Sequence, residues 1–197
     1  VYKEYSMSER ISLFDELKKG GYETGIITTF NVDFPFYEDV LLRRMRSSGI
    51  EHQMLMVDRG MCLQAMADRP PRMCGQHYTL APMACGGAFH PKVLLLLGKD
   101  KGFLAVGSHN VTLSGYGQNL EITNAVRFHK KSNRDTLQLL KAAYEACLTW
   151  VADYGSDLPS DIVASFDKVK HISPWLTDNS EDVATATQFL FSSKSTA

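Results

Sequence analysis

The sequence has no long hydrophobic run and no excess of charge of either sign. Its longest apolar runs are about five residues, whereas a helix that crosses a bilayer needs about 20 apolar residues. Residues 1–10 are polar, and no apolar segment of the kind found in secretory signals follows them. The 21 Lys and Arg residues nearly balance the 22 Asp and Glu residues, so the formal net charge is −1. We therefore expect a cytoplasmic protein without a membrane partner, in which any surface that binds a polyanion is a local patch.

Cysteine is scarce and irregularly spaced. Cys62, Cys74, Cys85 and Cys147 are the four cysteines, and no two of them are separated by two residues, which suits a reducing compartment. Cys74, His77 and Cys85 offer three zinc ligands. No fourth ligand lies near them in the sequence, and structural zinc sites are normally four-coordinate. We therefore expect no metal ion and no other cofactor.

Cationic residues cluster at three places that are candidates for contact with a polyanion. The simpler interpretation of each cluster is a solvated helix face or turn. The clusters are Arg43, Arg44 and Arg46, then Arg69 and Arg72, and finally Lys99 and Lys101 close to the motif described below.

Length and composition predict one compact globular unit. The chain has 197 residues, of which 44% are hydrophobic and 22% charged, and it contains no internal repeat or low-complexity segment. We expect a catalytic domain over residues 1–155, followed over 156–197 by a helix and a segment that leads toward a further domain. Because the chain opens without a methionine and stops on a serine-rich end, we expect it to be part of a longer protein.

Hydrophobic periodicity alternates between helix and strand along the chain. This alternation predicts an α/β fold, in which a mixed sheet is flanked by helices. Helices are expected over 8–20, 40–49, 61–67, 136–151 and 160–170, and strands over 25–30, 53–57, 77–83, 93–97, 103–106, 120–128 and 188–191.

The most informative segment lies between residues 88 and 121. Two apolar stretches, 93–97 and 103–106, flank a run of turn formers, which predicts a hairpin. If the hairpin is centred on Asp100, its register places His90 opposite Asn110 and Lys92 opposite Ser108. Side chains two residues apart share a face of a strand, so these four polar groups are expected to form one patch with Cβ atoms about 5 Å apart across each pair.

The four groups of this patch suit chemistry on a phosphate. The His90 imidazole can act as a nucleophile or as an acid and base, and Lys92 and Asn110 can donate to the oxygens on which charge develops. Asn119 and Glu121 are again two residues apart, at the start of the expected strand over 120–128. A carboxylate there can hold the far nitrogen of an imidazole. The candidate catalytic residues are therefore His90, Lys92, Asn110 and Glu121, and the candidate substrate-binding residues are Ser108, Asn119, Lys92 and Asn110.

These residues resemble the signature of the phospholipase D superfamily. His90-Pro91-Lys92 matches its His-x-Lys, and Gly107 to Asn110 matches its Gly-Ser-x-Asn. The following Gly-x-x-x-Asn-x-Glu, which ends at Glu121, is similar to the continuation in the nuclease branch. Many members carry an Asp five residues after the Lys, where this chain has Leu97. The members that lack this Asp include tyrosyl-DNA phosphodiesterases and metal-independent restriction endonucleases, and the His-to-Asn and His-to-Glu spacings are similar to those of the restriction enzymes.

The resemblance implies a phospholipase D-like fold and a metal-independent phosphodiesterase acting on DNA, in a restriction or antiviral defence protein. In that family one histidine attacks phosphorus while a second protonates the leaving oxygen. This chain supplies one competent His-x-Lys, because His129-x-Lys131 lacks the apolar strand and the Gly-Ser-x-Asn. The resemblance therefore implies a homodimer in which two copies of His90 share one site and form a phosphohistidine.

Two other functions stay open at this stage. A phospholipid phosphodiesterase or phosphatidyl transferase would use the same chemistry, but it should carry an exposed apolar stretch near the site, and the sequence contains none. A non-catalytic dimerisation or DNA-docking module would not need intact motif residues. His109 is expected to be structural or to lie at the rim of the substrate site, and Tyr116 is expected either to stack on a base or to pack in the interior.

Overall fold

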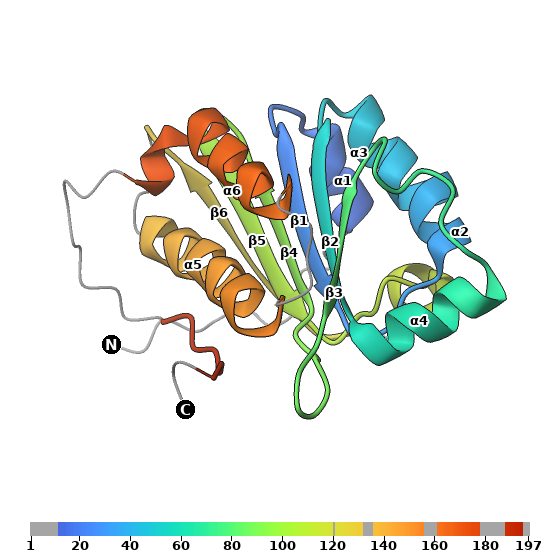
Figure 1. Ribbon diagram of the computed structural model, residues 1–197. Coiled ribbons are helices and arrows are strands. Elements are labelled where there is room, and N and C mark those ends of the chain that lie inside the picture. The colour runs from blue at the N-terminus through green and yellow to red at the C-terminus, as the bar shows by residue number, and fades with distance from the viewer. Residues whose placement is uncertain (1–11, 120, 132–135, 156–160, 178–187, 195–197) are drawn as a thin grey trace.

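A mixed six-stranded sheet lies at the centre of the protein, with helices on both faces (Figure 1). The computed structural model describes residues 12–119, 121–131, 136–155, 161–177 and 188–194. The strand order is β3-β2-β1-β4-β5-β6, with parallel pairing from β1 to β3 and antiparallel pairing from β1 through β4 and β5 to β6. The strands are β1 (Thr24–Thr29), β2 (His52–Asp58), β3 (Thr79–Met83), β4 (Val93–Leu97), β5 (Lys101–Gly107) and β6 (Thr123–His129).

The helices divide between the two faces of the sheet, as Figure 1 shows. One face carries α5 (Leu137–Tyr154) and α6 (Asp161–Ile172), with a 3₁₀ turn η4 (Pro174–Leu176) after them. The other face carries α1 (Leu13–Lys18), the continuous helical segment of α2 (Phe34–Phe36), η1 (Tyr37–Leu42) and α3 (Arg43–Ser47), and α4 (Arg59–Asp68). A π-helical turn, η2 (Ser114–Gln118), lies between β5 and β6. No helix in the described part of the chain is long and apolar enough to cross a membrane.

Aspartates at strand ends begin two of the helices. Asp33 follows β1 and accepts a hydrogen bond from the Phe36 amide at 3.1 Å. Asp58 ends β2 and accepts one from the Met61 amide at 3.1 Å. Both are N-caps, whose carboxylates satisfy backbone donors that the first helical turn leaves unpaired. The chain therefore turns sharply from strand to helix at the same edge of the sheet.

Strand β4 separates two hydrophobic layers. Val93, Leu95 and Leu97 pack in the layer under α5 and α6, and Leu94 and Leu96 pack in the layer under the other helices. All five side chains are buried, and burying each aliphatic side chain contributes about 1.5–3 kcal/mol before entropy is counted. The continuous apolar run thus fixes β4 as a central strand with two covered faces.

The expected α/β architecture is confirmed, but the register of the β4–β5 hairpin differs from the expected one by one residue. Val93 pairs with Val106, and Leu97 pairs with Gly102. The reason is a two-residue turn at Lys99 and Asp100, closed by a hydrogen bond from the Gly98 amide to the Lys101 carbonyl at 2.9 Å. The predicted pairs of His90 with Asn110 and of Lys92 with Ser108 are therefore wrong.

Two expected strands also differ from the structure. β6 begins at Thr123, so Asn119 and Glu121 lie in the loop before it, while Leu120 lies outside the described residues. Residues 188–191 are irregular and form no strand. They lie over α5, where the Trp150 indole donates to the Ser192 carbonyl at 3.0 Å.

Candidate active site

The loops that carry the motif meet at one edge of the sheet. The strand directions bring the carboxyl ends of β1, β2, β3 and β5 to the edge at which β4 and β6 begin. Loop 84–92 enters β4 there, and loop 108–122 connects β5 to β6. Residues from distant parts of the sequence are consequently neighbours at this edge.

His90 and Lys92 form a direct pair. The Lys92 Nζ atom lies 2.9 Å from Nδ1 and 3.4 Å from Nε2 of the His90 ring, and it donates to the His90 carbonyl at 3.1 Å. The imidazole is exposed to solvent. One of its faces packs against the Phe30 ring, with the two ring centroids 4.7 Å apart. The imidazole is therefore oriented by its neighbours and still accessible to a ligand.

The Lys92 ammonium is held in a largely dry position. The residue is only 6% exposed. Burial lowers the pKa of the Lys92 ammonium, and the negative charge of Glu121 acts in the opposite direction. An ammonium in such a position interacts more strongly with a phosphate oxygen than it would in water.

Asn110 is oriented by the end of β1. Its Oδ1 atom accepts from the Asn31 backbone amide at 3.2 Å and lies 3.3 Å from the Thr29 hydroxyl. A backbone N–H can only donate, so this contact determines which end of the carboxamide is the oxygen. The Nδ2 group has no hydrogen-bond partner among the described residues, and it is left to donate to a bound anion.

Glu121 lies within a small polar cluster and does not contact His90 in the described part of the chain. The Ser108 hydroxyl donates to the Glu121 carboxylate, and Asn119 Nδ2 donates to it at 3.3 Å. The Ile122 amide in turn donates to the Ser108 hydroxyl at 3.1 Å. Ser108 and Asn119, which we expected to bind substrate, here hold the carboxylate. Burial lowers the pKa of both Lys92 and His109, and the charge of Glu121 offsets part of that lowering at each group.

His109 and Tyr116 are packed inside the loop between β5 and β6. His109 is 5% exposed, and burial lowers its pKa. Its ring meets the Tyr116 ring edge to face at 5.2 Å, and Tyr116 also packs against Phe36. Of the two interpretations of Tyr116 left open by the sequence, the structure supports interior packing, and it gives His109 a structural position.

The motif glycines are explained by close packing. A side chain at Gly115 would collide with the Asn110 carbonyl oxygen. A Cβ at Gly107 would lie 2.6 Å from the Ile122 carbonyl oxygen and 2.9 Å from His109 Nδ1. Only glycine allows the backbone to approach this closely, so both glycines keep the loop folded against the catalytic asparagine candidate.

Asp58 holds the loop that carries His90, and the sequence did not reveal this role. Its second carboxylate oxygen accepts from the Phe89 backbone amide at 2.9 Å. Phe89 is buried against Trp150, with ring centroids 5.6 Å apart. The residue before His90 is thus fixed on both sides. The only signal for this role in the sequence is a carboxylate at the end of a buried strand. Such a carboxylate more often serves only as a helix cap.

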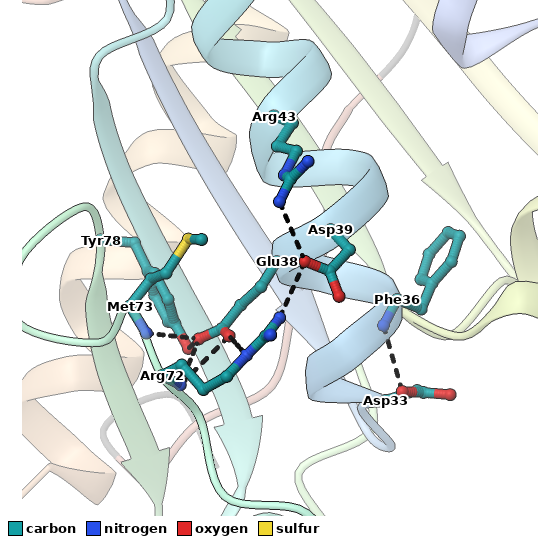
Figure 2. Close-up of polar contacts among 8 residues, drawn as sticks. All are labelled: Asp33, Phe36, Glu38, Asp39, Arg43, Arg72, Met73 and Tyr78. Carbon is teal, nitrogen blue, oxygen red and sulfur yellow. Dashed lines mark hydrogen bonds and ion pairs between the residues drawn. The ribbon is translucent and has the colours of Figure 1, made fainter.

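The candidate cationic patches are largely neutralised or remote from this edge. Figure 2 shows Arg43 and Arg72 converging on Asp39, with N to O distances of 3.5 and 2.8 Å. Arg72 also reaches the buried Glu38 at 3.3 Å. Arg69 lies 3.8 Å from the Asp33 carboxylate. Arg43, Arg69 and Arg72 therefore each have a carboxylate partner.

Lys99 and Lys101 do not lie beside the site, contrary to our expectation. Lys99 lies in the turn between β4 and β5 and Lys101 is the first residue of β5, at the edge of the sheet opposite to the one that carries His90. The motif lies at the start of β4 and the turn follows its end. The length of the strand therefore separates these lysines from His90 and Lys92.

An open groove begins at the His90 and Lys92 pair. Its volume is about 1460 Å³. Residues 85–93 form one wall, residues 188–194 form another, and side chains of β5, β6 and α5 line the space between them. The continuous apolar run beside the motif, Val93–Leu97, is buried in β4, and tertiary packing assembles the apolar lining of the groove from separate segments.

Comparison with known proteins gives fold resemblances at low identity. No protein-family model matches the chain, and no curated protein sequence matches it. The similar solved structures include Nuc from Salmonella typhimurium, a phospholipase D family member, at 14% identity and a TM-score of 0.43, covering 67% of this chain and 84% of that one. NucT from Helicobacter pylori has 13% identity and a TM-score of 0.38, with coverages of 81% and 86%. Polyphosphate kinase from Porphyromonas gingivalis has 15% identity and a TM-score of 0.44, with coverages of 84% and 26%.

Proposed function

We propose that this chain is a metal-independent phosphodiesterase that hydrolyses DNA. The observation that carries the proposal is the arrangement of three groups at one sheet edge: an exposed imidazole, a buried ammonium 2.9 Å from it, and a carboxamide whose Nδ2 points away from its backbone anchors. The match of these residues to the His-x-Lys and Gly-Ser-x-Asn signature gives the same chemistry. The similarity of the spacing to restriction endonucleases supports a role in restriction or antiviral defence.

In the proposed reaction a nitrogen of His90 attacks the phosphorus. The P–N bond forms as the P–O bond to the leaving oxygen breaks, and that oxygen takes a proton from a general acid. Lys92 and Asn110 donate to the non-bridging oxygens as their charge grows, and each such donor is worth about 10²–10³ in rate. Water then attacks the phosphohistidine, the P–N bond breaks, and the former acid accepts the proton of the water.

The general acid is proposed to come from a second copy of the chain. His109 is the other histidine of the motif loop, and it is buried against Tyr116. A twofold dimer would place the partner's imidazole across a single phosphate and would pair two lysine ammonium groups around it. Those two positive charges would supply the stabilisation that other nucleases obtain from a metal ion.

The direct test is hydrolysis of plasmid DNA by the purified chain in EDTA. The wild-type chain should nick the plasmid, and His90→Ala should not, while its circular dichroism stays unchanged. Equal turnover by His90→Ala would remove this histidine from the mechanism. A wild-type chain that binds DNA without cleaving it would instead favour the docking module.

Mixing the two chains tests the shared site. At an about fourfold excess of His90→Ala, random pairing leaves about one wild-type chain in five with a wild-type partner, so turnover per wild-type chain should fall to about 20%. Turnover per wild-type chain that stays constant would mean that each subunit works alone.

The apolar groove favours a second candidate function. A phosphodiester with an apolar substituent could place that substituent along the groove while its phosphate lies at Lys92. Phospholipid vesicles and plasmid DNA, each incubated with the chain in EDTA, separate the two functions. Release of the lipid headgroup without nicking of DNA would assign the chain to lipid chemistry.

A further inference from the structure

The last two residues of β1 each contact one half of the motif. Thr28 and Thr29 are 2% and 0% exposed, in a strand whose other central residues are isoleucines. Buried hydroxyl groups are costly unless they form hydrogen bonds. Both threonines form several, and their partners belong to the loops that carry the candidate catalytic groups.

Thr28 replaces missing backbone pairing beside the His-x-Lys. The ladder between β1 and β4 ends at Ile27 and Leu94, and Pro91 has no N–H with which to extend it. The Thr28 hydroxyl instead accepts from the Val93 amide and donates to the Pro91 carbonyl, both at 2.9 Å. The two residues that flank Lys92 are therefore bound to a single hydroxyl.

Thr29 performs the corresponding role beside Asn110. Its hydroxyl accepts from the Val111 amide at 3.1 Å, donates to the Asn31 carbonyl at 2.7 Å, and lies 3.3 Å from Asn110 Oδ1. These contacts bind the residue after Asn110 to the end of β1 and hold Asn31, whose amide orients the carboxamide.

We propose that Thr28 and Thr29 are positioning residues that together set the separation between the His90–Lys92 pair and Asn110. Successive strand residues point to opposite faces of the sheet. Thr28 therefore contacts the His90–Lys92 half of the motif on one face, and Thr29 contacts the Asn110 half on the other. The two halves come from separate loops, and no ladder hydrogen bond joins His90 or Lys92 to Asn110. The proposal rests on the proposed function, since it assigns these hydroxyls a role in that reaction.

The test uses isosteric substitutions and a matched control on the same strand. Thr28→Val and Thr29→Val remove the hydroxyl but keep the shape. Thr24→Val is the control, because Thr24 lies in β1, is 0% exposed, and its hydroxyl has no hydrogen-bond partner among the described residues. Turnover of plasmid DNA and of bis(4-nitrophenyl) phosphate should fall about 10- to 100-fold in kcat for the first two variants, since an error of about 1 Å costs this much. The control should keep wild-type kcat.

Serine variants separate positioning from stability. Thr28→Ser and Thr29→Ser keep the hydroxyl and lose a methyl group, so we expect near-normal kcat together with a lower melting temperature. The valine variants should lose kcat, and they should also lose stability, because the Val93 or the Val111 amide is left without its acceptor. If the valine variants retain kcat within about twofold of the control, or if the serine variants lose as much kcat as the valine variants, the positioning role is wrong.

A spectroscopic readout keeps this test independent of catalysis. In NMR spectra of the selectively labelled chain, Thr28→Val should shift the His90 ring signals and Thr29→Val should shift the Asn110 side-chain amide, whereas Thr24→Val should shift neither. A wild-type chain that cleaves no phosphodiester but gives these shifts would overturn the proposed function alone. Unchanged His90 and Asn110 signals in both valine variants would overturn the positioning proposal.

Discussion

Substitution of Asn110 should separate catalysis from stability, because its two amide atoms have different partners. Oδ1 accepts from the Asn31 amide at 3.2 Å, and Nδ2 is left for the substrate. Asn110→Asp keeps an acceptor at Oδ1 and the same shape, and it replaces the donor with an anionic oxygen. Asn110→Ala removes both atoms.

The expected magnitudes follow from these contacts. Loss of one donor to the developing oxyanion should lower kcat about 10²–10³-fold in either variant, and the added negative charge makes the Asp variant the less active of the two. The Ala variant also leaves the Asn31 amide unpaired. Because Asn31 and Asn110 are half-buried, the cost should be near the lower limit for an orphaned donor, about 1 kcal/mol. The Asp variant should lose less than this.

Two assays measure these effects on the same samples. Urea unfolding gives the free energy of unfolding, and hydrolysis of plasmid DNA in EDTA gives kcat. Both variants should lose about 10²–10³-fold in kcat, and the Asp variant should stay almost as stable as the wild-type chain whereas the Ala variant should be less stable. An Asp variant within about tenfold of wild-type kcat would refute the assignment of Nδ2 as a donor to the transition state.

Two further substitutions test the surroundings of the site. Glu121→Gln removes a negative charge that acts to raise the pKa of Lys92. The ammonium should then deprotonate at lower pH, and the alkaline limb of the pH–rate profile should move to lower pH. An unmoved limb would place Glu121 outside the site. Glu38→Ala removes the buried carboxylate that accepts from the Arg72 and Met73 amides at 2.9 and 2.8 Å (Figure 2). It should lower the free energy of unfolding by about 2–5 kcal/mol, with Glu38→Gln losing less, and a loss below about 1 kcal/mol would show that these amides find other partners.

Local signals in the sequence were sufficient for the central strand and for the contact between His90 and Lys92. The run from Val93 to Leu97 can only be satisfied by burial on both faces, so it predicted a central strand without knowledge of its neighbours. The His90–Lys92 contact was equally local, because side chains two residues apart on an extended chain lie on one side. The helices that follow Asp33 and Asp58 begin earlier than the expected positions 40 and 61, although the two capping contacts involve neighbouring residues only.

Contacts across the sheet required the tertiary structure. Hairpin register depends on how the turn at Lys99 and Asp100 closes, and a slip of one residue exchanges the faces of every side chain. The Asn110 side chain is therefore held by Thr29 and Asn31 at the end of β1, and not by a partner residue beside β4. The pairing of Arg72 with Glu38 depended in the same way on packing between segments distant in the chain.

The sequence by itself therefore determined which chemical groups this protein carries and that His90 and Lys92 lie on one side of the chain. The tertiary structure alone decided what holds those groups, which of them already have partners, and that an apolar groove opens beside His90. The physical reason is the range of the interactions. Strand burial, helix capping and turn formation are decided within a few residues, whereas the hydroxyls of Thr28 and Thr29 acquire their roles only when strands more than sixty residues apart come into contact.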